Sequence, residues 1–170
     1  ARPVVMPETD DPDVNVYASA YATWMLQRAA SAGLPVPRDM LDHALDDLAR
    51  RVESQDLAHA GAGVTAELGA PLALALHALA DAGERSEEID AATAALYARR
   101  DALPLFARAL LLLALHRRDP NSKDVATLVD ELQVRVRRDP TGAHVDELLP
   151  YAMDAYFHSD TRSDALVLLA

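Results

Sequence analysis

Several polar residues in the last third of the chain have side chains that could hold a metal ion. Imidazole nitrogens and carboxylate oxygens are common ligands of zinc and calcium. The spacing of these residues matches no metal-binding motif, so we interpret them as solvated loop residues and predict no metal and no other cofactor. They are His144, Asp146, Glu147, His158 and Asp160.

Two histidines are each followed four residues later by an aspartate, a spacing that brings both side chains to one face of a helix. Such a carboxylate could orient the imidazole for proton transfer. The pairs are His43 with Asp47 and His77 with Asp81. We expect His43 to be exposed and His77, in an apolar segment, to be a hydrogen-bonded structural residue.

Two serines are the candidate nucleophiles. Ser159 and Ser163 lie in no Gly-x-Ser-x-Gly sequence, and no motif places a histidine beside either of them. Helix capping explains both serines better. The chain has no cysteine, which excludes thiol nucleophiles and disulfides within these residues. We therefore predict no catalytic residue and expect that the chain is not an enzyme.

One arginine and three aromatic residues are the remaining candidates for a binding site. Arg162 begins an apolar segment, where a guanidinium group needs a buried carboxylate or several carbonyl partners. We expect it to be paired and its role to be structural. Tyr17, Tyr21 and Trp24 could line a ligand cleft, although aromatic residues at helical spacing more often belong to a core.

Length and charge limit the fold and the partners. With 170 residues the chain is about one domain, 1–170. The net charge of -11 argues against nucleic acid or an anionic membrane as a partner. The longest apolar run, Ala109 to Leu115, is far shorter than the roughly 20 residues of a membrane span. Because Ala1 is not a methionine and the last six residues are all apolar, we expect a piece of a longer protein.

The hydrophobic pattern predicts an all-α fold of about seven helices, in which two kinds alternate. The first kind is apolar on nearly every side and should be enclosed, whereas the second has one apolar stripe and should cover it. Enclosed helices are predicted at 13–32, from 65 or 71 to 82, at 103–116 and from 161 onward. Covering helices are predicted at 37–52, 87–99 and 123–136.

The residues between these segments are typical of helix ends. Gly33 and Gly83 suit a left-handed residue after a last turn, and Pro37 suits a first helical position. Ser86 and Ser122 are expected N-caps. Arg-Arg-Asp-Pro occurs at 117–120 and 137–140, where the cations and the proline should stop two helices. Alternating hairpins of this kind indicate an α/α toroid, with an open superhelical repeat as the alternative.

Two segments resemble the thioester-type domain of bacterial alpha-2-macroglobulin-like proteins. One is Tyr17-Ala-Ser-Ala-Tyr-Ala-Thr-Trp-Met-Leu26, followed by Gly33-Leu-Pro-Val-Pro37. The other is Tyr156-Phe-His-Ser-Asp-Thr-Arg-Ser-Asp-Ala-Leu-Val-Leu-Leu-Ala170, which is similar to that family's Ser-x-Thr-Arg-x-x-Ala-Leu signature. The resemblance spans about Val14 to Ala170. It gives a structural role to Tyr17, Tyr21, Trp24, Gly33, Pro37, Ser159 and Arg162.

The resemblance implies about half of an α/α toroid within a large periplasmic or extracellular inhibitor that traps target proteases. The thioester Cys and Gln of that family would lie before Ala1, and no catalytic role passes to His59, because no motif around it matches. A partial ring also leaves apolar edges, so we expect a capacity for self-association. Two other functions stay open: a helical-repeat scaffold that binds proteins, and an α/α-toroid carbohydrate enzyme with two facing carboxylates.

Overall fold

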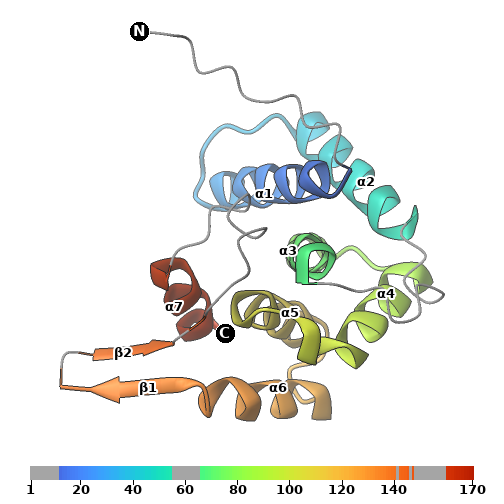
Figure 1. Ribbon diagram of the computed structural model, residues 1–170. Helices are drawn as coiled ribbons and strands as arrows, with labels where there is room; N and C mark the ends of the chain where they lie inside the picture. Colours follow the sequence, from blue (N-terminus) through green and yellow to red (C-terminus); the bar gives the residue numbers. More distant parts are fainter. Residues whose placement is uncertain (1–11, 55–65, 141, 146, 148–159) are drawn as a thin grey trace, which may run out of the picture.

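The computed structural model describes residues 12–54, 66–140, 142–145, 147 and 160–170, and within them the chain is all-α apart from one short hairpin (Figure 1). The all-α prediction is therefore confirmed. The helices are α1 (Pro12–Ser31), α2 (Arg38–Ser54), α3 (Ala66–Ala82), α4 (Glu87–Ala98), the short 3-10 helix η1 (Arg100–Ala102), α5 (Leu105–Arg118), α6 (Lys123–Gln133) and α7 (Asp160–Leu169). The strands are β1 (Val136–Asp139) and β2 (Gly142–Val145), which pair in antiparallel fashion.

The helices form an inner and an outer layer. The inner helices α1, α3, α5 and α7 each contact the next one in that order, and α2, α4 and α6 pack outside them (Figure 1). Tyr17 and Arg162 meet near the starts of α1 and α7, and Gln27 meets Ala78 near the ends of α1 and α3. The helices predicted to be enclosed form the inner layer, and the helices predicted to cover them form the outer layer. Closure of these layers into a toroid stays a prediction.

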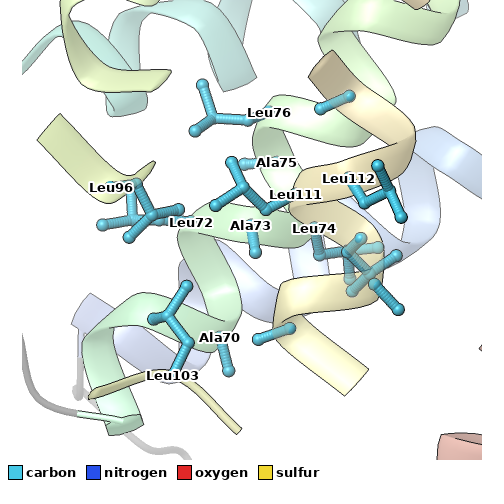
Figure 2. Packing of buried hydrophobic residues seen from close by; sticks show 14 of the residues in the cluster. Ala70, Leu72, Ala73, Leu74, Ala75, Leu76, Leu96, Leu103, Leu111 and Leu112 are labelled. Carbon is cyan, nitrogen blue, oxygen red and sulfur yellow. The ribbon is translucent and has the colours of Figure 1, made fainter. Parts of the chain in front are cut away.

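The core lies between α3 and α5. Every residue from Leu72 to Leu79 is buried, as are most of the residues of α5, so the predicted enclosure of these two helices is confirmed. Figure 2 shows side chains from α3, α4 and α5 gathered in one cluster. The outer helices each bury one stripe at helical spacing, as expected. These stripes are Leu45, Leu48 and Val52 in α2, Ile89, Ala92, Thr93 and Leu96 in α4, and Val125, Leu128 and Leu132 in α6.

The predicted helix ends are largely confirmed. Gly33 has φ +79° and Gly83 has φ +84°, and the residue after each donates its N–H to a carbonyl five residues back, which is the Schellman geometry. Ser86 and Ser122 cap α4 and α6 through hydrogen bonds of 3.1 and 3.2 Å to the N–H groups of Ile89 and Val125. Pro37 lies one residue before α2, and its carbonyl accepts the first helical N–H, that of Leu41.

Two of the four helices predicted to be enclosed are open on one side. In α1 the exposed residues include Tyr21 at 48% and Met25 at 46%, and in α7 Leu168 and Leu169 are 65% and 63% exposed. These predictions were wrong because α1 and α7 are the two ends of the inner series, and each has only one of the other inner helices packed firmly against it. Enclosure depends on neighbours on both sides, which an apolar sequence alone does not provide.

The segment after α6 was also predicted wrongly. Arg137 and Arg138 do not end a helix; they lie in β1, opposite His144 and Ala143 of β2. Val136, the last residue of the covering helix predicted at 123–136, pairs with the buried Val145. The N–H of Val145 donates to Asp164 Oδ1 at 2.7 Å. The hairpin is therefore fixed by its contact with α7. The sequence Thr161-Arg162-Ser163-Asp164 fits a capping box, but α7 begins at Asp160, so Thr161 lies in its first turn and is not a cap.

Candidate functional site

The four inner helices surround a cavity of about 300 Å³ that opens between α1 and α7. Its wall combines aromatic side chains with a charged group. Four residues predicted from the sequence line this cavity: Tyr17, Tyr21 and Trp24 on α1, and Arg162 on α7. The lining residues are Tyr17, Tyr21, Trp24, Leu74, Phe106, Leu110, Arg162, Ala165, Leu166 and Leu169.

Arg162 lies at one end of this cavity and links three inner helices. Its Nη1 donates a hydrogen bond of 3.1 Å to the phenol oxygen of Tyr17 on α1. Its guanidinium carbon lies 4.2 Å from the ring centroid of Phe106 on α5. Two of the contacts of Arg162 are therefore with a phenol and with an aromatic face, on which a planar cation stacks favourably.

The Tyr17 hydroxyl keeps its proton at neutral pH. Burial raises the pKa of this phenol above its ordinary value, and the positive charge of Arg162 only partly opposes the shift. The pair thus consists of a cation and a neutral hydroxyl. Together they make this part of the cavity wall polar.

The aromatic residues of α1 continue along the cavity from Tyr17. The rings of Tyr17 and Tyr21 are stacked with centroids 6.5 Å apart, and Tyr21 meets Trp24 edge to face at 6.2 Å. Tyr17 and Trp24 pack against the core, whereas Tyr21 lies at the exposed mouth. The sequence left open whether these aromatic rings belong to the core or line a cleft. In the structure they do both.

His77 lies behind Trp24, with ring centroids 5.7 Å apart, and is buried. We expected a hydrogen-bonded histidine, but Nδ1 is buried and has no hydrogen-bond partner among the described residues. Asp81 pairs with Arg117 Nη2 at 2.9 Å, a competing partner that helical spacing does not reveal. Burial lowers the pKa of His77; Asp81 opposes this shift, and Arg117 and Arg28 add to it. His43, in contrast, is exposed as predicted.

The candidate metal ligands do not come together in the part of the chain that the structure describes. No group of three His, Asp or Glu side chains is placed there to hold an ion. Glu147 instead accepts a hydrogen bond from the backbone N–H of Leu105 and one of 3.0 Å from the Ser163 hydroxyl. His144 Nδ1 lies 3.7 Å from Asp139 Oδ2 across the hairpin. Asp146, His158, Ser159 and the side chain of Asp160 lie outside the described residues.

Sequence reasoning missed several contributors to these contacts. Ser163 was assigned to helix capping, but its side chain is fully buried inside α7 and bonds to Glu147. Leu74, Phe106 and Leu110 read as ordinary core residues, and nothing in their spacing distinguishes a cavity wall from a filled interior. Gly33 and Pro37 lie in the connection between α1 and α2, apart from the cavity lining.

Comparisons with protein-family models, curated proteins and solved structures found no match to this chain. None of the helices in the described ranges has the length and apolar character needed to cross a bilayer.

Proposed function

We propose that the chain is a non-catalytic helical segment of the thioester-type domain of a bacterial alpha-2-macroglobulin-like endopeptidase inhibitor. The observation that carries this proposal is the contact between the two segments that resemble the family. Tyr17 begins the first and Arg162 lies in the second, and they form a hydrogen bond across 145 residues of sequence. Two segments that resemble one family and meet in space fit a single structural junction better than two chance likenesses do.

The open sides of α1 and α7 also support a partial ring. Tyr21 and Met25 on α1, and Leu168 and Leu169 on α7, leave large apolar side chains in contact with water at both ends of the inner layer. Further inner helices would cover these sides in a complete toroid. The role of the segment is then mechanical: it forms a rigid wall that holds the reactive or docking surface until a protease cleaves the parent protein, in the periplasm or outside the cell.

The test uses the full-length protein that contains this chain, incubated with trypsin and run on a denaturing gel. If the parent carries a thioester, a covalent adduct should appear, and treatment with methylamine beforehand should abolish it. If it carries none, trypsin should still be retained after cleavage and co-elute with the parent in gel filtration. Catalytically inactivated trypsin is the control and should give neither result. A parent that is neither cleaved nor able to retain trypsin contradicts the proposal.

The second candidate is a helical-repeat scaffold that binds another protein. It is favoured by the mouth of the cavity, where Tyr21 and Leu169 are both exposed and line the same opening. Such a scaffold should bind its partner without prior cleavage, which separates it from the inhibitor. A carbohydrate enzyme receives no comparable support, because the described residues that line the cavity include no carboxylate, and glycosidases generally use two.

A further inference from the structure

The hairpin of β1 and β2 has one edge that the described residues leave uncovered. β2 lies between β1 and α7, and within the described ranges the extensive contacts of β1 are with β2 (Figure 1). A strand at the edge of a sheet has backbone N–H and C=O groups that point away from the sheet and can pair with a further strand. The register of the hairpin identifies these groups on β1.

The outward-facing backbone groups of β1 belong to Val136 and Arg138. In an antiparallel pair of strands, opposite residues that exchange two hydrogen bonds alternate with opposite residues that exchange none. Val136 lies opposite Val145, whose N–H donates to Asp164 on α7, so these two residues exchange none. Arg138 lies two residues further along β1 and is therefore of the same kind. Outside the hairpin, no backbone hydrogen bond joins Val136 or Arg138 to another described residue.

The charge along this edge is positive, although the whole chain has a net charge of -11. Arg135, Arg137 and Arg138 are exposed, and the one acidic residue in 134–140 is Asp139, which lies 3.7 Å from His144 Nδ1. If two copies of β1 paired in antiparallel fashion through Val136 and Arg138, Arg137 would lie opposite its counterpart, and like charges disfavour this. Carboxylates on an added strand would instead form opposite-charge pairs.

We propose that the open edge of β1 binds an extended acidic segment of a partner protein as a third strand. Backbone hydrogen bonds to Val136 and Arg138 would provide affinity, as in other cases of strand addition. Carboxylates beside Arg135 and Arg138 would select the partner by its charge. Because β1 is short and its arginines are exposed, binding should depend on the salt concentration. The proposal concerns the hairpin and holds whether or not the parent protein is a protease inhibitor.

A synthetic peptide tests the sign of the charge. The probe is a fluorescein-labelled peptide of about eight residues, an ordinary strand length, in which glutamate and valine alternate. Its fluorescence anisotropy at low ionic strength should show saturable binding that weakens as salt is added. A peptide with lysine in place of glutamate should not bind. Absence of saturation with the glutamate peptide, or equal affinity for the lysine peptide, overturns the proposal.

Amide exchange distinguishes strand pairing from general electrostatic attraction. When the peptide is bound, the N–H groups of Val136 and Arg138 should exchange more slowly, because they point to the open edge. Those of Arg137 and Asp139 face β2 and should change little. A glutamate–valine peptide that is methylated at every backbone nitrogen keeps its charges but cannot donate hydrogen bonds, so it should not bind. Unchanged exchange at Val136 and Arg138, or equal affinity for the methylated peptide, contradicts the proposal.

Variants at one position separate the charge from the backbone. Arg138→Gln removes a charge and should weaken binding about two- to fivefold. Arg138→Pro also removes the outward N–H, which an edge strand tolerates, and should weaken binding about three- to tenfold further. Arg50→Gln is the matched control, since Arg50 is exposed on α2, and its affinity should equal that of the parent chain.

Far-UV circular dichroism confirms that each variant is folded. A folded Arg138→Pro variant that binds as well as Arg138→Gln contradicts the proposal; should it not fold, unchanged exchange at Val136 and Arg138 in the parent chain does so. Gel filtration tests the other occupant of the edge. A dimer that Arg138→Pro dissociates would assign the edge to a second copy of the chain and overturn the proposal.

Discussion

Arg162 and Tyr17 join the last inner helix to the first through a hydrogen bond of 3.1 Å, although 145 residues separate them in sequence. The same guanidinium lies over the ring of Phe106, so one side chain contacts α1 and α5 while it belongs to α7. This contact spans the opening between α1 and α7.

Removal of this hydrogen bond should have a measurable cost. Tyr17→Phe keeps the ring and deletes the hydroxyl, so we expect a loss of about 1 to 2 kcal/mol in the free energy of unfolding. Urea denaturation of Tyr17→Phe, Arg162→Met and the double variant would give the coupling energy. Tyr21→Phe is the matched control, since no hydrogen bond of its hydroxyl is seen among the described residues. Strictly additive effects would mean that the two side chains do not stabilise each other.

The stability of the fold should decrease as the pH falls below about 6.5. The pKa of His77 is lowered in the folded chain, so the unfolded chain takes up this proton first and is favoured by it. The contribution of His77 is therefore complete above the ordinary pKa of about 6.5 and is lost on acidification. Urea titrations between pH 7.5 and pH 5.5 should show a shallower slope for His77→Gln. His43→Gln, at an exposed position, should keep the slope of the parent chain; equal slopes for all three proteins would contradict this assignment.

The two glycines at the ends of α1 and α3 should resist substitution for a purely conformational reason. Gly33 and Gly83 have φ of +79° and +84°, yet no atom lies within 4 Å of an added Cβ. Alanine at either site should cost about 1 to 2 kcal/mol, the penalty of the left-handed conformation. Thermal unfolding should show a smaller loss for Gly33→Asn, since asparagine tolerates this region. If Gly33→Ala and Gly33→Asn unfold alike, the backbone account is wrong.

Glu147 should hold α7 in place. Its two carboxylate oxygens accept hydrogen bonds from Leu105 at the start of α5 and from Ser163 in α7. Glu147→Ala leaves both donors without this partner, at an expected cost of about 1 to 3 kcal/mol. Amide exchange should accelerate in α7 more than in α3. Glu131→Ala breaks the pair with Arg100, whose Nη2 lies 2.9 Å from the carboxylate, and should leave exchange in α7 unchanged.

Local signals account for the parts of the fold that the sequence predicts well. Ser86 and Ser122 act through hydrogen bonds within one turn, and Gly33 acts through its own backbone, so each can be identified without knowledge of the tertiary structure. The stripes of α2, α4 and α6 are equally local. The segment at Arg137 behaves differently, because its strand conformation depends on pairing with β2 and on the contact of Val145 with α7.

The site was only partly predictable for the same reason. The sequence marked Tyr17, Tyr21, Trp24 and Arg162, and the structure brings all four to one cavity. The exposure of Tyr21 depends on which helices pack beside α1, and the pairing of Asp81 with Arg117 depends on the approach of α3 to α5. Such properties depend on how the helices pack against each other, and the hydrophobic pattern of neither helix predicts them.

Each inner helix contacts mainly the inner helix that precedes or follows it along the chain. Such a chain can therefore change in length by whole pairs of helices. Apart from the contact of Arg162 with Tyr17, each pair of helices packs mainly on the adjoining pair, so the free energy of folding accumulates largely unit by unit. Duplication or loss of a pair at the α7 end would leave the surroundings of Leu48 and Leu76 intact. A chain with this arrangement can therefore gain or lose pairs of helices while the remaining pairs keep their packing.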